Sequence, residues 1–146
     1  MQTGVFVVIK DHVEKICCVR HAYGMGKWGL PGGAKEKGEC VVIAGKREVR
    51  EETGLSIVDV TLVGTFMLTK TPGRVVLCRA RIAGGMVRTE ADEEIAECAF
   101  FSPEEIQEME EFFYPAQFKL IQWEVFHTPD TEPIISPLIS PAVEAL

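Results

Sequence analysis

The chain has 146 residues, of which 47% are hydrophobic, and a formal net charge of −7 at pH 7. This length predicts one domain with a full core, and the apolar content excludes wholesale disorder. The acidic balance argues against sequence-independent binding to a nucleic-acid backbone, which needs a basic face. Apolar runs such as residues 5–9 are too short to span a membrane, and residues 1–4 lack the basic start of a secretory signal. We therefore expect a cytoplasmic protein that contacts neither membrane nor nucleic acid.

The five cysteines have no zinc-ligand spacing. Buried thiols in a reducing cytoplasm are favoured over disulfides. Cys17 and Cys18 are adjacent in an apolar run, so they should point to opposite faces of a strand.

In the first half of the chain, β-type apolar runs at residues 5–9 and 15–20 flank a short polar stretch, which predicts a hairpin. A loop rich in glycine follows. The next pattern predicts a helix over residues 39–53, which ends where Gly54 can take the left-handed conformation of a helix cap.

In the second half, β-type runs at residues 57–68 and 74–82 are joined by a Thr-Pro-Gly turn, which predicts another hairpin. Gly64 inside the first run predicts a bulge. An acidic loop, residues 90–94, precedes a strand at 97–101. Two helices then follow: the first begins at the capping sequence Ser-Pro-Glu-Glu of residues 102–105, and the second spans 116–126.

Residues 129–146 form a tail with four prolines, too many for a helix. Its apolar residues predict that it packs on something. The two alternatives are the preceding domain, residues 1–128, and a partner subunit in a homodimer.

The helix predicted over residues 39–53 concentrates negative charge. Glu48, Glu51 and Glu52 fall within roughly a 100° arc of one face, where like charges repel. Ala44 and Gly45 share that face and leave the carboxylates unobstructed. A bound divalent cation would relieve the repulsion, and oxygen ligands suit Mg²⁺ or Mn²⁺ better than zinc.

A solvated acidic helix, with carboxylates paired to Lys46, Arg47 and Arg50, is the alternative for this segment. A wider pattern argues against it. Gly33, five residues, Glu39 and seven residues lead to Arg47-Glu-Val-x-Glu-Glu-x-Gly-Leu55. This pattern resembles the Nudix box, the signature of Nudix hydrolases, and the Trp-Gly-Leu-Pro-Gly of residues 28–32 resembles the usual approach to it.

The resemblance implies an α/β fold, an α/β/α sandwich with a mixed sheet and helices on both sides. The residues alone indicate only one domain of α/β or α+β class. The implied activity is Mg²⁺-dependent hydrolysis of a diphosphate linkage in a small nucleotide, with Mn²⁺ as an alternative ion.

The implied metal ligands are Glu48, Glu51, Glu52 and the main-chain carbonyl of Gly32. Either Glu48 or Glu52 is the base that accepts a proton from water, and the residues do not choose between them. Arg47 is expected to orient Glu48 or Glu51, since an arginine cannot serve as a base. Glu39 is expected to start the helix, where its charge complements the helix dipole.

Many members of the family add a carboxylate from a later loop, which serves as a further metal ligand or as the catalytic base. Glu94 is favoured for this role over Glu93 and Glu97, with an acidic solvent loop as the alternative.

Trp28 and Arg20 are candidate substrate contacts, although loop packing explains Trp28 as simply and an exposed strand end explains Arg20 as simply. Residues 112–114 are aromatic and favour a core role over a stacking platform. His12, His21 and His127 lack metal spacing and suit the surface.

The short chain favours a nucleoside triphosphate as substrate, cleaved to the monophosphate and pyrophosphate. The alternatives are ADP-ribose or another nucleotide sugar, and a dinucleoside polyphosphate. A Nudix-fold ligand sensor without catalysis is the rival from another class, although such proteins often have a damaged box.

Overall fold

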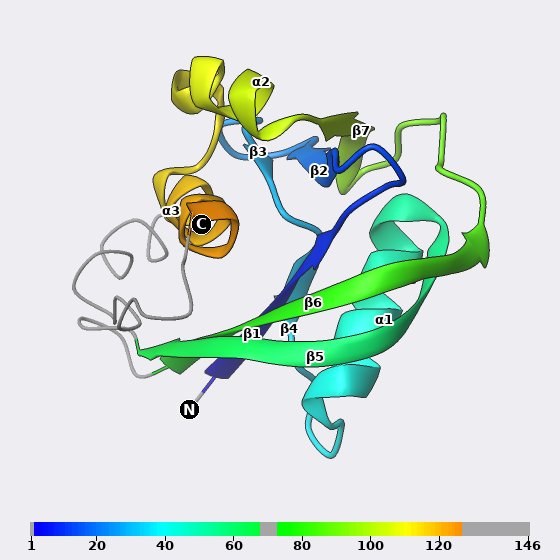
Figure 1. Cartoon of the computed structure of the whole chain (residues 1–146). Helices are drawn as coiled ribbons and strands as arrows, with labels where there is room; N and C mark the ends of the chain where they lie inside the picture. The colour runs from blue at the N-terminus through cyan, green and yellow to red at the C-terminus, as the bar shows by residue number, and fades with distance from the viewer. Residues whose placement is uncertain (1, 68–72, 127–146) are drawn as a thin grey trace.

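A computed structural model describes residues 2–67 and 73–126, and the predicted tail lies outside the described residues. The elements follow one another along the chain in the order seen in Figure 1. They are β1 (Gln2–Ile9), β2 (Ile16–His21), β3 (Trp28–Gly29), β4 (Gly32–Ala34), α1 (Val41–Thr53), β5 (Leu55–Met67), β6 (Gly73–Gly85), β7 (Ile95–Phe101), α2 (Pro103–Glu108), a 3₁₀ turn (Glu110–Phe112) and α3 (Pro115–Phe126). Within the described part of the chain, no helix combines the length and the apolar character needed to cross a membrane.

The strands form a mixed four-stranded sheet, ordered β4-β1-β6-β5, and a smaller antiparallel sheet, ordered β3-β2-β7. In the larger sheet β1 runs parallel to β6 and antiparallel to β4. The predicted α/β fold with a mixed sheet is therefore confirmed.

The predicted hairpin between the first two strands is wrong beyond its turn. Asp11 organises a tight turn, its Oδ1 accepting hydrogen bonds from the backbone N–H groups of Val13 and Lys15 at 2.9 Å each. Only Lys10 and Ile16 then pair. Both edges of β1 are already occupied, by β4 and β6, so β2 departs into the second sheet. An apolar β-type run in the sequence indicates a strand, but it does not show which edge of a neighbouring strand is free to pair with it.

The second hairpin is confirmed. Strands β5 and β6 pair antiparallel from Leu55–Gly85 to Met67–Arg74, and the register shifts between Leu62 and Gly64, at the predicted bulge. The predicted turn, with Pro72, lies outside the described residues.

Two apolar cores occupy the two faces of the larger sheet. Alternate residues of β1 separate between them: Val5 and Val7 pack with Ala44 and Val49 of α1, whereas Val8 packs with the core beneath α3. Figure 1 shows α1 and α3 on opposite sides of the sheet. The helices therefore cover both faces, as a sandwich requires.

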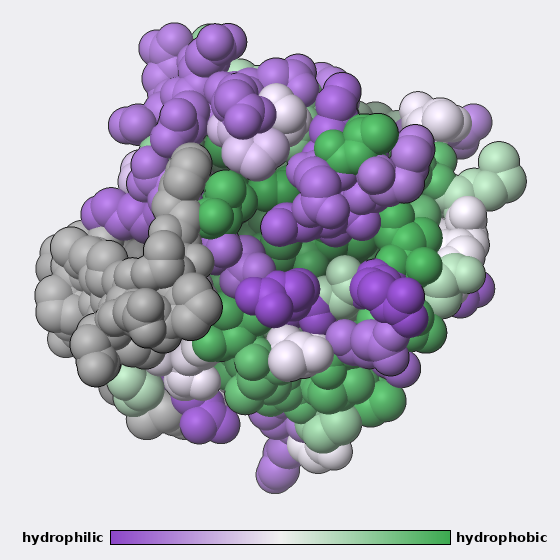
Figure 2. All heavy atoms as spheres, viewed as in Figure 1, coloured by the Kyte–Doolittle hydropathy of each residue, from purple (hydrophilic) through white to green (hydrophobic). Residues whose placement is uncertain are grey.

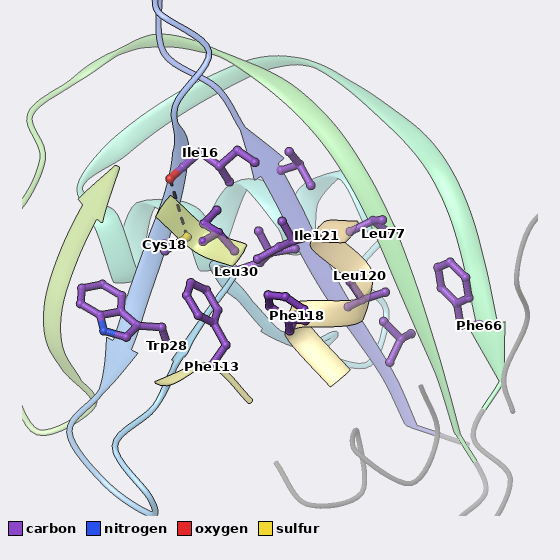
Figure 3. Packing of buried hydrophobic residues seen from close by; sticks show 13 residues of the cluster. Ile16, Cys18, Trp28, Leu30, Phe66, Leu77, Phe113, Phe118, Leu120 and Ile121 are labelled. Atoms are coloured by element: carbon purple, nitrogen blue, oxygen red, sulfur yellow. Dashed lines mark hydrogen bonds between the residues drawn. The ribbon is translucent and has the colours of Figure 1, made fainter. Parts of the chain in front are cut away.

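The core on the α3 side is rich in aromatic residues. In Figure 3, Phe113, Phe118 and Ile121 meet Leu30 and Cys18 around α3. Cys18 belongs to this core and Cys17 to the other one, so the predicted opposite faces are confirmed. All five cysteines are free thiols; three of them are buried, but Cys40 is exposed, against the prediction.

The helices after β7 begin as the sequence predicts. Ser102 and Glu105 form a reciprocal capping box at the start of α2, with proline at the first helical position. Helix α3 begins one residue before its predicted start and ends where predicted, at Phe126. Figure 2 shows hydrophilic side chains gathered over α2, as expected for a helix with one buried residue, Ile106.

Gly54 ends α1 in the left-handed conformation, with φ 82°. An added Cβ would lie 2.3 Å from the carbonyl oxygen of Met86, so this glycine also permits a close approach of two backbone segments. Gly38 has nearly the same φ, 84°, but open space around its missing Cβ. A side chain at Gly38 would therefore meet only backbone strain, whereas one at Gly54 would meet backbone strain and a steric clash.

Replacing each glycine by alanine measures the two effects. We expect Gly38→Ala to lower the free energy of unfolding by about 1–2 kcal/mol, the cost of left-handed backbone. Gly54→Ala should cost at least about 2 kcal/mol more, because the Met86 segment must also move. Urea denaturation measures both values, and equal losses would contradict the close contact.

Candidate active site

The acidic face of α1 is turned toward the protein. Glu48 and Glu52 are 8% and 2% exposed, whereas the side chain of Glu51 is 54% exposed. Gly45 explains this orientation: a Cβ there would lie 3.3 Å from Val7 and 3.5 Å from Val5. The small residues of this helix therefore serve close packing on β1, rather than leaving the carboxylates open as the sequence suggested.

Glu52 is the more deeply buried carboxylate. Its Oε1 accepts a hydrogen bond of 2.7 Å from the backbone N–H of Gly32 in β4. Burial raises the pKa of Glu52 to about 9, the hydrogen bond lowers it in part, and the charge of Glu48 raises it further. Without a cation, this position holds a proton at neutral pH.

Glu48 lies directly against the glycine loop. A Cβ on Gly33 would stand 2.8 Å from its Oε1, so a larger residue there would displace this carboxylate. Burial raises the pKa of Glu48, although the Arg47 guanidinium opposes the shift through a hydrogen bond of 3.0 Å.

Arg47 contacts Glu48 and Glu51, the residues that it was predicted to orient, and it also joins the glycine loop to the acidic helix. Its Nε and Nη2 donate to the two carboxylate oxygens of Glu39 at 2.7 and 3.0 Å, and its Nη2 also donates to the Ala34 carbonyl at 3.1 Å. Its Nη1 reaches Glu48 at 3.0 Å and Glu51 at 3.4 Å. Arg47 thus hydrogen-bonds three carboxylates, and its bond to Glu48 holds that side chain in place.

Glu39 does not start the helix, contrary to expectation. Cys40 is the N-cap, without a side-chain hydrogen bond, and the first turn holds no acidic residue. The Glu39 carboxylate turns instead to Arg47 and to the backbone N–H of Glu36. Arg47 holds the pKa of Glu39 at about 2.

Glu94 reaches the same place from the segment between β6 and β7. One carboxylate oxygen each from Glu48, Glu52 and Glu94 lie within 4.8 Å of one another. Among the residues that the structure describes, this group has three possible metal-ligand atoms close together. Glu51 lies outside it, and the role of the Gly32 carbonyl stays a prediction.

The chemistry of this cluster fits a hard divalent cation. All three side-chain donors are carboxylate oxygens, the ligands that Mg²⁺ and Mn²⁺ prefer. Two of them are buried with raised pKa values, so the charged forms are costly unless a cation compensates them. Glu94 is exposed, which leaves the cluster open toward solvent on one side.

A pocket of about 530 Å³ opens beside the cluster. Glycines, apolar side chains and polar side chains all contribute to its wall. The lining residues are Gln2, Gly4, Phe6, His21, Tyr23, Gly29, Leu30, Gly32, Gly33, Ala34, Glu48, Glu52, Arg74, Val75, Glu94 and Gln117.

The structure does not bring the two predicted substrate contacts to this wall. Trp28 is 8% exposed in the aromatic core, edge-on to Phe101 with ring centroids 4.9 Å apart. Arg20 pairs with Glu97 at 2.7 Å across β2 and β7. Of the aromatic residues 112–114, Phe113 and Tyr114 are buried as expected, whereas Phe112 is 55% exposed.

Other pocket residues were missed by the sequence reasoning. His21 stacks on Tyr23, with ring centroids 4.9 Å apart, and its Nδ1 lies 3.3 Å from the Tyr114 hydroxyl. Burial lowers the pKa of His21, and burial followed by the charge of Glu94 raises the pKa of Tyr23. The spacing of the three residues in the chain carries no signal of this contact.

Gln117 of α3 was also missed. Its Oε1 accepts a 3.0 Å hydrogen bond from the backbone N–H of Leu30, which fixes the orientation of the amide. Its buried Nε2 has no hydrogen-bond partner among the described residues. The pocket wall therefore includes a polar group with unused donor capacity.

The class of the protein is therefore an α/β/α sandwich domain that carries a carboxylate cluster beside a pocket. Within that class, the family model described as "NUDIX domain" matches residues 1–123. The chain belongs to the NUDIX family.

Two other proteins are similar in sequence to this chain over part of their length. The human protein named "8-oxo-dGDP phosphatase NUDT18" is 40% identical over 78 residues, which cover 52% of this chain and 24% of that protein. A "MutT-like protein" from Streptomyces ambofaciens is 37% identical over 103 residues, 70% of this chain and 64% of its own. The chain thus spans less than two thirds of either relative.

A solved structure is similar over nearly the whole chain. It is a "NUDIX hydrolase from Nitrosomonas europaea", 26% identical, with a TM-score of 0.75 over 91% of this chain and 93% of its own. This similarity agrees with the described fold.

The raised pKa of Glu52 predicts how stability depends on pH in the metal-free protein. Between its ordinary value of 4.5 and about 9, the folded protein keeps a proton that the unfolded chain releases. The contribution of Glu52 to stability is therefore fully present below pH 4.5 and is lost as pH rises to 9. Glu52→Gln should flatten this fall and exceed the wild type at pH 8 by more than about 1.4 kcal/mol, the worth of one pKa unit.

Denaturation in the presence of EDTA at several pH values measures this effect. Glu104→Gln, an exposed residue of α2 outside the cluster, should keep the wild-type slope. Equal slopes for the wild type and Glu52→Gln between pH 5 and 9 would show that Glu52 is not a buried, protonated carboxyl.

Proposed function

We propose that this protein is a divalent-cation-dependent pyrophosphohydrolase that cleaves a diphosphate linkage in a small nucleotide. The observation that carries the proposal is the cluster of Glu48, Glu52 and Glu94 at the pocket. Arg47 and the Gly32 N–H offset the burial of these two carboxylates only in part, and a cation would offset the rest. Membership of the NUDIX family supports the same reading.

Glu48, Glu52 and Glu94 would hold the cation, Mg²⁺ or in its place Mn²⁺. The Gly32 carbonyl and Glu51 remain proposed ligands because they match the metal-binding positions of the Nudix box. When bound, the cation neutralises phosphate oxygens and lowers the pKa of a coordinated water.

The chain itself supplies positions and a proton acceptor. Glu48 and Glu52 are the candidate bases for the attacking water, because both lie in the cluster. Arg47 holds Glu48 in place and keeps its own charge throughout. Phe6 and Gln117 line the pocket that would receive the substrate.

We propose a nucleoside triphosphate as substrate, cleaved to the monophosphate and pyrophosphate. A relative named for 8-oxo-dGDP supports a purine nucleotide as the first probe. ADP-ribose, other nucleotide sugars and dinucleoside polyphosphates are the alternative substrates. A catalytically silent nucleotide sensor is the alternative function, and the filled acidic positions of the box disfavour it.

A substrate panel tests the proposal. The purified protein is incubated with nucleoside triphosphates, 8-oxo-dGTP, 8-oxo-dGDP, ADP-ribose and a dinucleoside polyphosphate, with and without Mg²⁺. We expect hydrolysis that requires Mg²⁺, and Glu52→Gln should lower kcat/KM by at least about 100-fold. The control Glu104→Gln, on the exposed side of α2, should stay within about twofold of the wild type.

Two results would contradict the proposal. Tight binding of one nucleotide without turnover of any would support the sensor instead. A Glu52→Gln enzyme as active as the wild type would remove the proposed cluster from the chemistry.

A further inference from the structure

The third carboxylate of the cluster has the least support from regular structure. Glu48 and Glu52 are held by α1, but Glu94 is exposed and lies just before β7, at the end of the irregular segment 86–94. An exposed side chain on such a segment loses conformational entropy when it is held in one place. Something must therefore fix its backbone for the three oxygens to stay within 4.8 Å.

Arg88 attaches this segment to the end of α1. Its Nη1 donates to the carbonyl of Glu51 at 3.2 Å and to that of Glu52 at 3.5 Å. Its backbone N–H donates to the Thr53 carbonyl at 2.9 Å. These carbonyls belong to the last turn of the helix, which lacks internal partners and carries partial negative charge, so a guanidinium suits the position.

Asp92 connects Arg88 to the backbone of Glu94. Its Oδ2 accepts from Arg88 Nη2 at 2.7 Å. Its Oδ1 accepts from the backbone N–H groups of Glu94 and Ile95 at 2.8 and 2.6 Å. On the other side, the Glu94 carbonyl accepts from the Ala22 N–H at 2.9 Å.

We propose that Arg88 and Asp92 are positioning residues for metal binding: together they hold the Glu94 carboxylate against Glu48 and Glu52. Two side chains connect the Glu52 carbonyl to the Glu94 N–H, so the helix-borne and loop-borne ligands are fixed relative to each other. The inference rests on the proposed function in one respect, because it takes Glu94 as a ligand.

A merely structural role predicts something different. An ion pair four residues apart near the surface stabilises a fold only slightly, and its loss would lower the melting temperature regardless of metal. A positioning role predicts a loss of metal affinity that depends on Glu94. Groups that support metal ligands typically change affinity by about 10–100-fold when removed.

The test is a double-mutant cycle that measures metal binding without activity. Melting temperatures are recorded across a Mg²⁺ titration, and the half-saturating concentration is compared among variants. Asp92→Ala should raise that concentration by about 10-fold in the wild-type background. In the Glu94→Gln background it should add less than about twofold, because the ligand that it positions is already gone.

Two further variants sharpen the result. Glu93→Gln removes the same charge from the neighbouring exposed position, and it should leave the half-saturating concentration within about twofold. Asp92→Asn keeps an oxygen for the two N–H groups but loses the ion pair, so it carries the test if the alanine variant does not fold. We expect it to raise the concentration on the order of threefold, again only when Glu94 is present.

The inference is overturned if Asp92→Ala lowers the melting temperature but leaves Mg²⁺ half-saturation unchanged. It is also overturned if the effect is equally large with and without Glu94. A wild type whose melting temperature ignores both Mg²⁺ and Mn²⁺ would instead refute the proposed function, and the inference with it.

Discussion

The packing of α1 on β1 is the constraint on which the site depends. Gly45 lets the helix approach Val5 and Val7 closely, and this contact turns Glu48 and Glu52 toward β4. There the carboxylates meet the glycine loop, with Gly32 donating to Glu52 and Gly33 leaving room for Glu48. Packing that stabilises the core thus forces two like charges into a poorly solvated position. Burial raises the pKa of both groups. Under the proposed function a divalent cation would resolve this conflict, whereas the apolar contacts alone do not.

The remaining parts of the site come from distant segments of the chain. Arg47 ties the glycine loop to the helix through Glu39 and Ala34. The segment after β6 brings Glu94, and α3 brings Gln117 to the wall of the pocket. Arg88 attaches the segment after β6 to backbone carbonyls of α1, and Gln117 attaches α3 to the backbone N–H of Leu30. The geometry of the cluster is therefore a property of the whole sandwich, and changes away from the carboxylates should alter how a cation is held.

What the sequence predicts well here is local. Gly54 as a helix cap, the capping box at Ser102 and the bulge at Gly64 depend on nearby residues, and the structure has all three. The resemblance added the family and the fold. Predictions that needed long-range information were less successful. The β1–β2 pairing failed because other strands occupy both edges of β1, and Glu39 turned to an arginine eight residues away. The pocket wall at His21 and Gln117 carried no sequence signal, because its members meet only after folding.

The central claim is that the fold holds a cation between Glu48, Glu52 and Glu94. The most direct measurement is a crystal structure of the protein grown with Mn²⁺, with the ion located by its anomalous scattering. The account predicts an anomalous peak within about 2.0–2.4 Å of carboxylate oxygens from this cluster, and no such peak there in crystals of Glu52→Gln grown in the same way. Manganese bound elsewhere, with the three carboxylates left without an ion at saturating concentration, would contradict it.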